Sequence, residues 1–216
     1  MTKNESPAPV PTPVPVPAST TAPITGLLLA AGGGRRLGGR PKALLEHRGR
    51  PLVEHAVGVL RAAGCDRVHV VLGADAGAVR ERAELTGCVL VENPDWERGM
   101  GSSLRAGLAS LAGTGTRAAL VSLVDQPGIG AAAVRRVCAA YEGGESLVSA
   151  VYDGTRGHPV LLGSAHWAGI AASASGDRGA RAYLKAHGDA LRLVECGDVA
   201  RPYDIDTAED LARYLE

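Results

Sequence analysis

The chain of 216 residues carries 23 Lys and Arg against 23 Asp and Glu, and it is long enough for one sizeable core. Because nucleic acid and membrane surfaces demand a basic excess, this balance argues against both as partners. No apolar run reaches the length of a membrane span, and the proline-rich beginning lacks the apolar segment of a secretory signal. The four cysteines form no C-x-x-C pair, which excludes a zinc ribbon and suits a reducing cytoplasm.

Residues 1–23 alternate Pro with small residues, which predicts a disordered or polyproline II tail. Residues 24–216 are predicted to form a single domain in which strands alternate with helices. The predicted strands are 24–31, 68–72, 88–91, 118–124, 147–152, 158–162 and 191–196. The predicted helices are 51–63, 76–85, 102–111, 129–141, 165–172, 178–187 and 207–215. This order predicts an α/β fold, a three-layer αβα sandwich around a mostly parallel (mixed) Rossmann-like sheet, with an antiparallel excursion at 147–162.

A glycine-rich, basic stretch follows the first predicted strand, where residues 26–42 read GLLLAAGGGRRLGGRPK. Glycine lets a backbone pass close to a ligand, and successive free N–H groups form an anion site. The P-loop pattern fails because Arg40 and Pro41 stand where Lys and Ser or Thr are required. The dinucleotide fingerprint fails because Gly38 comes one residue late. The stretch is predicted to bind a polyphosphate, and the alternative is a glycine-rich turn with solvated arginines.

Ligands of such sheets bind beyond the carboxyl ends of the strands, so the loops there should share one crevice. Ser102 or Ser103 could hold a nucleotide, or simply provide the N-cap of the next helix. Asp125 ends a buried strand, and its simplest role is that of a Mg²⁺ ligand. Alternation points Asp204 and Asp206 the same way. Asp206 is the preferred second metal ligand, although it could instead cap the last helix.

The string LAAGGGRRLGGRPKALL resembles the signature L-A-A-G-x-[SG]-x-R-[ML]-G-…-K-x-L-L of the MobA-like nucleotidyltransferases. NPDWERGMGSSL, VDQP, GHP, GDRGAR and DIDTAEDL are similar to further motifs of that family, in the same order. Within the family, the chain most resembles the molybdenum cofactor cytidylyltransferases. Ala31 in LAAG and Gln126 after Asp125 are the cytidylyltransferase-like variants.

The resemblance implies Mg²⁺-dependent transfer of CMP from CTP to Mo-molybdopterin, with release of pyrophosphate. The product would serve apo-enzymes of the xanthine dehydrogenase family. Catalysis is assigned to Arg36, Lys42 and Asp125, and metal binding to Asp125 and Asp206. The nucleotide-binding residues would be Leu29, Ala30, Ala31, Gly32, Gly33, Gly34, Arg36, Lys42, Asn93, Gly99, Met100, Ser102 and Ser103. The acceptor would contact His158, Asp177 and Arg181.

Two rival functions remain open. The first is nucleotidyl transfer to another phosphorylated acceptor, such as GTP-dependent transfer to molybdopterin, or transfer to a sugar phosphate or an isoprenoid precursor. The basic loop would serve any of these. The second is a non-catalytic carrier of the molybdenum cofactor. Asp125 and Lys42 argue against a carrier, because it needs no magnesium.

Overall fold

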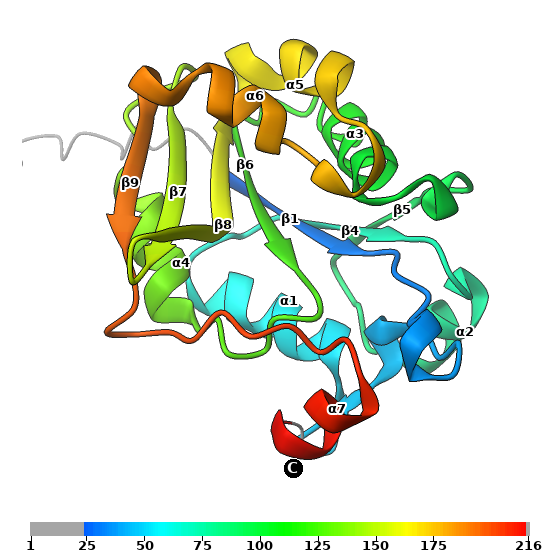
Figure 1. Ribbon diagram of the computed structural model, residues 1–216. Helices are drawn as coiled ribbons and strands as arrows, with labels where there is room; N and C mark the ends of the chain where they lie inside the picture. Colours follow the sequence, from blue (N-terminus) through cyan, green and yellow to red (C-terminus); the bar gives the residue numbers. More distant parts are fainter. Residues whose placement is uncertain (1–23, 215–216) are drawn as a thin grey trace, which may run out of the picture.

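A seven-stranded sheet forms the middle layer of the computed structural model, which describes residues 24–214 (Figure 1). The predicted tail 1–23 and the end of the predicted last helix lie outside the described residues. The strands are β1 (Ile24–Ala30), β4 (Val68–Leu72), β5 (Val89–Glu92), β6 (Ala118–Leu123), β7 (Leu147–Tyr152), β8 (Thr155–Gly163) and β9 (Leu191–Glu195). Their order is β5-β4-β1-β6-β8-β7-β9, and β8 runs antiparallel to both of its neighbours. The predicted mixed, mostly parallel sheet is confirmed.

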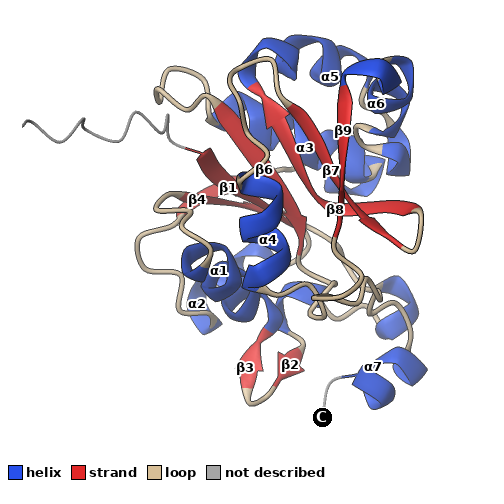
Figure 2. Cartoon of the chain, turned by 90° about the vertical axis from the view of Figure 1, so that its left-hand side faces the viewer, coloured by secondary structure: helices blue, strands red, loops and turns tan. Residues whose placement is uncertain are grey.

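Helices cover both faces of this sheet (Figures 1 and 2). One face carries α1 (Leu52–Ala62), α2 (Ala76–Arg82) and α4 (Ala131–Cys138). The other carries α3 (Met100–Ser110), α5 (Trp167–Ser173) and α6 (Arg181–Ala186). The last helix, α7 (Ala208–Tyr214), lies below the first face in Figure 1. The predicted three-layer αβα architecture is therefore confirmed.

Strand β1 shows why the sheet needs two helical layers. Leu27 and Leu28 are both fully buried, but Leu27 belongs to the core under α3 and Leu28 to the core under α1. A central parallel strand is covered on both faces, so its sequence is a continuous apolar run rather than an alternation. Within residues 24–214, none of the helices has the length and apolarity that crossing a membrane demands.

Several local predictions were wrong. Helix α3 begins at Met100 with Gly99 as its N-cap residue, so neither Ser102 nor Ser103 caps it. The predicted helix 178–187 is interrupted at Gly179, whose φ of 50° breaks the turn, and α6 starts only afterwards. The two-stranded pair β2 (Glu46–His47) and β3 (Arg50–Pro51) was not predicted, because strands of two residues show no periodicity.

The return of the chain after β9 positions the site. Strand β9 lies at the far edge of the sheet, separated from β6 by β7 and β8. The chain then crosses back, and the Ile205 amide donates to the Asp125 carbonyl at 2.9 Å, with Ile205 fully buried. This segment, and not strand adjacency, brings Asp206 to the carboxyl end of β6.

Candidate functional site

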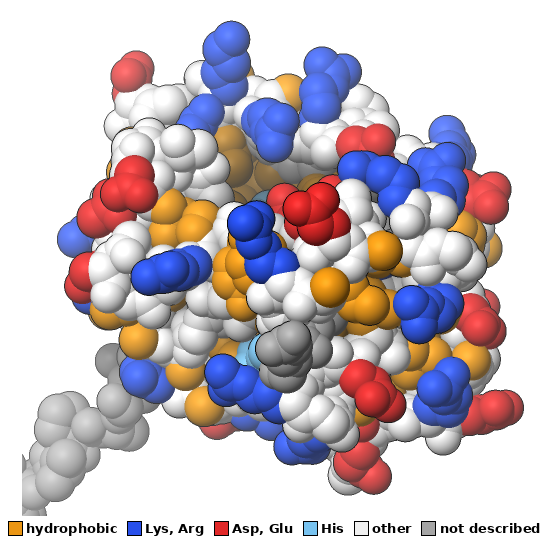
Figure 3. Space-filling view, turned by 60° about the horizontal axis from the view of Figure 1, so that its bottom comes forward, with side chains coloured by type: hydrophobic (Ala, Val, Ile, Leu, Met, Phe, Trp, Pro, Cys, Tyr) orange, Lys and Arg blue, Asp and Glu red, His pale blue; other side chains and the backbone are white. Residues whose placement is uncertain are grey.

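A cavity of about 450 Å³ opens beyond the carboxyl ends of β1 and β6. Such a volume is typical of a small-molecule site. Its walls come from the loop of residues 31–41 after β1, called here the glycine loop, and from Lys42, the segment 96–103, the end of β6, Asp177 and Asp206. The face seen in Figure 3 is hollowed, and acidic side chains at the edge of the hollow lie next to Lys and Arg side chains. The site therefore combines both signs of charge.

The glycine loop leaves β1 and presents its backbone to this cavity. Gly34 has φ of 53°, and a Cβ there would collide with the Arg40 carbonyl oxygen, so only glycine fits. The loop is tied back by the Leu37 amide, which donates to the Gly34 carbonyl, and by the Lys42 amide, which donates to the Gly32 carbonyl at 3.1 Å. Among the backbone hydrogen bonds of residues 24–214, the amides of Gly32, Gly33 and Gly34 donate none. They are available to an anion.

Two carboxylates share the ammonium of Lys42. Its Nζ donates to Asp125 Oδ2 at 2.7 Å and to Asp206 Oδ1 at 2.5 Å. The Lys42 side chain is only 13% exposed, whereas Arg36, whose Nη2 lies 3.5 Å from Asp206 Oδ2, is 72% exposed. Lys42 is therefore held inside the site by two carboxylates, whereas Arg36 lies at the exposed edge of the site, where a ligand can reach it.

Charge pairing decides the protonation of Lys42. Burial alone disfavours its ammonium form, but Asp125 and Asp206 outweigh burial and raise the pKa of Lys42 above its ordinary value of 10.5. Lys42 is thus a permanent cation at neutral pH. It cannot act as a proton acceptor, and its chemistry is that of a fixed positive charge.

The same two carboxylates fit a divalent cation. Asp125 and Asp206 converge on a single point, now held by Lys42 Nζ, and the cavity beside them admits phosphate oxygens. Magnesium in proteins takes one or two carboxylates together with substrate phosphates. Within residues 24–214, no three His, Cys, Asp or Glu side chains form a metal cluster by themselves. The donor set fits a metal that arrives with its phosphorylated ligand.

Asp204 and Asp206, on the segment that follows β9, have different hydrogen-bond partners. Asp204 Oδ1 accepts from Gln126 Nε2 at 2.8 Å, and burial raises the pKa of Asp204, with further contributions from Asp125 and Asp206. Thr207 and Asp210 exchange hydrogen bonds in a capping box at the start of α7. Asp206 is therefore not needed as a cap and faces Lys42, which favours it over Asp204 as the metal ligand.

Asn93 organises the second wall of the cavity. Its Nδ2 donates to Ser102 Oγ at 2.9 Å and to Ser103 Oγ at 3.0 Å. All three side chains are buried, and Ser102 Oγ donates in turn to the Gly99 carbonyl at 2.8 Å. This network fixes the beginning of α3. Ser103 lines the cavity, whereas Asn93 and Ser102 support it from behind.

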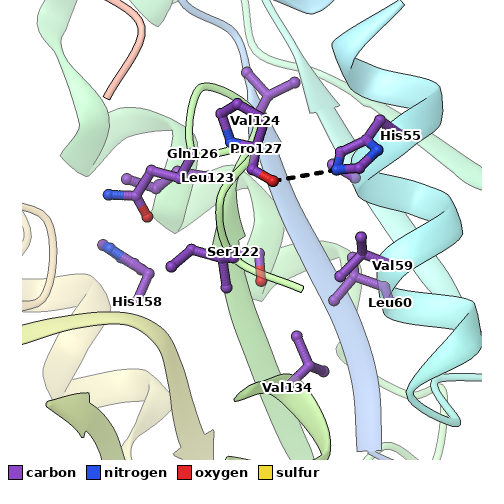
Figure 4. Close-up of a pocket in the computed structure, with 12 residues that line it drawn as sticks. His55, Val59, Leu60, Ser122, Leu123, Val124, Gln126, Pro127, Val134 and His158 are labelled. Carbon is purple, nitrogen blue, oxygen red and sulfur yellow. Dashed lines mark hydrogen bonds between the residues drawn. The ribbon is translucent and has the colours of Figure 1, made fainter. Parts of the chain in front are cut away.

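The three predicted acceptor residues are not brought together in one wall. Asp177 lines the large cavity and lies against Gly99, where a Cβ would be 2.5 Å from Asp177 Oδ1. His158 lines a separate small space of about 20 Å³ together with Gln126 and Ser122 (Figure 4). That volume suits one water molecule and no substrate. Arg181 is not among the residues lining either cavity.

We expect His158 to make the stability of the fold depend on pH. Burial lowers its pKa from 6.5 to about 4, which nearby Asp125 opposes and Arg181 reinforces. The folded protein therefore binds fewer protons than the unfolded chain between these values. We expect the contribution of His158 to the free energy of unfolding to be fully present above pH 6.5. It should fall by up to about 3 kcal/mol as the pH is lowered toward 4. Denaturant titrations of the His158→Gln variant should lose this part of the slope, and an unchanged slope would contradict the assignment.

Most of the predicted site residues line the large cavity, namely Leu29, Ala31, Gly32, Gly33, Gly34, Arg36, Lys42, Gly99, Met100, Ser103, Asp125, Asp177 and Asp206. Ala30 does not, because it alternates with Leu29 and faces the core under α1. Sequence reasoning missed Arg35, Trp96, Glu97, Leu123 and Val124, which also line it. The signal for Trp96 was present, since the indole stands in the motif between Asn93 and Gly99.

The chain is similar to known proteins over most of its length. The chain is 42% identical over 199 residues to nicotine blue oxidoreductase of Paenarthrobacter nicotinovorans, covering 89% of this chain and 96% of the relative. The structure of an Rv0371c homologue from Mycobacterium sp. strain JC1 superposes with a TM-score of 0.77 at 30% identity, over 90% of this chain and 96% of that one. The structure of a manganese complex of Rv0371c from Mycobacterium tuberculosis superposes with a TM-score of 0.70 at 30% identity, over 89% of this chain and 97% of that one.

The model of the MobA-like NTP transferase domain matches residues 26–191, a span that contains the glycine loop, Lys42, the Asn93 network and Asp125. The resemblance inferred from the motifs is confirmed. The chain therefore belongs to the MobA-like NTP transferases, a family of nucleotidyltransferase enzymes.

Proposed function

We propose that the protein transfers CMP from CTP to Mo-molybdopterin in a Mg²⁺-dependent reaction that releases pyrophosphate. The observation that carries the proposal is the convergence of Asp125 and Asp206 on Lys42, beside the free amides of the glycine loop. The manganese complex of the related Rv0371c structure supports the use of a divalent cation. The choice of CTP and of the acceptor rests on the motifs around Ala31 and Gln126.

The chain's own residues would supply binding and charge. An oxygen of the acceptor phosphate bonds to the α-phosphorus of the triphosphate, the α–β bridging bond breaks, and its electron pair leaves with pyrophosphate. A phosphate monoester has a second pKa of roughly 6, so it is ionised near neutral pH and needs no general base. The amides of Gly32, Gly33 and Gly34 and the exposed Arg36 would hold the β- and γ-phosphates. Lys42 would neutralise charge near the α-phosphate.

A bound Mg²⁺ would be held by Asp125 and Asp206 and would neutralise charge on the phosphates. The residues around this pair serve to orient it. The Asp125 carbonyl is tied to the Ile205 amide, so the two carboxylate-bearing segments are locked to one another. Such pre-set geometry is what phosphoryl-group transfer requires from a protein. We place the enzyme in the cytoplasm, where it would deliver its product to an apo-enzyme of the xanthine dehydrogenase family.

One assay tests the proposal. Purified protein is incubated with Mg²⁺ and each of the four nucleoside triphosphates, with and without Mo-molybdopterin, and pyrophosphate is scored. Release only with CTP and Mo-molybdopterin together supports the proposal, and chelation of the metal should abolish it. Release with another triphosphate or another phosphorylated acceptor would replace the substrate pair. No release with any pair would contradict nucleotidyl transfer.

The 42% identity to nicotine blue oxidoreductase favours a second candidate, an oxidoreductase that acts on nicotine blue or a similar compound. The same preparation should then change the absorbance of nicotine blue when an electron donor or acceptor is supplied. The absence of a G-x-G-x-x-G fingerprint argues against a dinucleotide bound in the common way. A change of nicotine blue without pyrophosphate release in the first assay would favour this candidate over the first.

A further inference from the structure

The indole of Trp96 lies where three loops meet. Trp96 follows β5, Gly73 follows β4 and Gly33 follows β1. These strands are parallel neighbours in the sheet, in the order β5-β4-β1, so their carboxyl ends lie side by side. Trp96 is partly exposed and lines the large cavity together with the glycine loop.

Two glycines make room for this side chain. A Cβ on Gly33 would lie 2.8 Å from Cη2 and 2.9 Å from Cζ3 of Trp96. A Cβ on Gly73 would lie 2.7 Å from Cγ of Trp96 and 2.8 Å from the Cβ of Ala31. Neither glycine has a positive φ, so backbone conformation does not demand glycine at these positions. The close approach of the indole does.

Trp96 also completes the enclosure of the glycine loop. On one side the loop is held by the Lys42 amide, which donates to the Gly32 carbonyl at 3.1 Å. At its start, the Ala74 amide donates to the Ala31 carbonyl at 3.1 Å. Gly33 directly follows the two residues that are tied in this way, has no side chain of its own, and is packed against the ring of Trp96. A glycine-rich segment without such packing would sample many conformations.

We propose that Trp96 is a positioning residue that holds the backbone amides of Gly32, Gly33 and Gly34 in their anion-binding arrangement. Through them it sets the affinity for the triphosphate, a part of the inference that rests on the proposed function. Donors that are fixed in advance cost no reorganisation when the ligand binds. Loss of the indole should therefore loosen the loop before it unfolds the domain.

The first test needs no ligand. Hydrogen exchange of the amides of Leu37, Gly39 and Lys42, which donate to the carbonyls of Gly34 and Gly32, should rise about tenfold in Trp96→Leu and in Gly73→Ala, whose new Cβ displaces the indole. Trp96→Phe keeps a ring and should stay near wild type. The matched control is Gly77→Ala, because a Cβ at that exposed helical position meets nothing within 4 Å. Unchanged exchange in both Trp96→Leu and Gly73→Ala would overturn the proposal, and Gly73→Ala keeps the test valid if Trp96→Leu does not fold.

The second test is a double-mutant cycle read as Kd for CTP with Mg²⁺. Gly33→Ala alone should weaken binding about tenfold, because its Cβ pushes against the ring. In the Trp96→Leu background the same substitution should cost much less, since the ring is gone. Strictly additive losses would show that Gly33 is needed only for close approach of the ligand and would overturn the positioning role. If wild-type protein binds no triphosphate, the proposed function fails, and the exchange experiment still decides the role of Trp96.

Discussion

Replacement of Asp125 by Asn should lower Mg²⁺-dependent pyrophosphate release by about 10³-fold or more. Asp125 Oδ2 is one of two carboxylate oxygens that meet at Lys42 Nζ, and its side chain is only 20% exposed. The amide keeps the size of the side chain and removes the charge that a metal ion and Lys42 both require. Loss of one fixed charge-stabilising group in an active site commonly costs about 10²- to 10³-fold, and loss of a metal ligand costs more. Initial rates at saturating CTP measure the effect.

A matched control for Asp125→Asn is Asp189→Asn. Asp189 is exposed in the short turn before β9, at the opposite end of the parallel strands from the cavity. This variant should turn over like wild type. Rates of Asp125→Asn within about threefold of the control would remove Asp125 from the metal site, and the proposed mechanism with it.

Replacement of Lys42 by Met should make the stability of the protein depend on Mg²⁺. Without the ammonium, Asp125 and Asp206 face each other without a shared cation, and we expect a loss of about 1 to 2 kcal/mol in the free energy of unfolding. Millimolar Mg²⁺ should restore much of it, because the metal then neutralises the two carboxylates that Lys42 no longer pairs with. Thermal unfolding with and without Mg²⁺ measures the effect. Pyrophosphate release should fall about a hundredfold, since the metal does not replace the fixed charge near the α-phosphate.

The control for Lys42→Met is Lys185→Met, an exposed position in α6. Its response to Mg²⁺ should equal that of wild type. Equal stabilisation of all three proteins by Mg²⁺ would mean that the two carboxylates do not form a cation site. In wild type, the folded protein raises the pKa of Lys42, whereas it lowers the pKa of His158, so the two groups affect stability at opposite ends of the pH range. Its contribution to stability is complete below pH 10.5 and is lost only as the pH rises through the higher folded value.

Local patterns in the sequence were enough for the order of the elements. The apolar run before Gly32 predicted β1, and the alternation of such runs with amphipathic segments predicted the layered sheet. The glycine loop was recognisable because its spacing is local, and Asp125 because a carboxylate at the end of a buried strand has no packing role. Predictions failed where periodicity could not decide. The beginning of α3 was placed at Ser102, although Asn93 uses that serine as a hydrogen-bond acceptor instead.

The sequence by itself determined the fold class, the glycine loop and the presence of a carboxylate beyond β6, because each depends on residues close together in the chain. Only the tertiary structure decided that Asp206 meets Asp125 at Lys42, since this requires the return of the chain from the far edge of the sheet. Only the tertiary structure placed Trp96 against Gly33 and Gly73. Contacts between distant segments follow from the packing of the whole sheet and its helices, and no local pattern contains them.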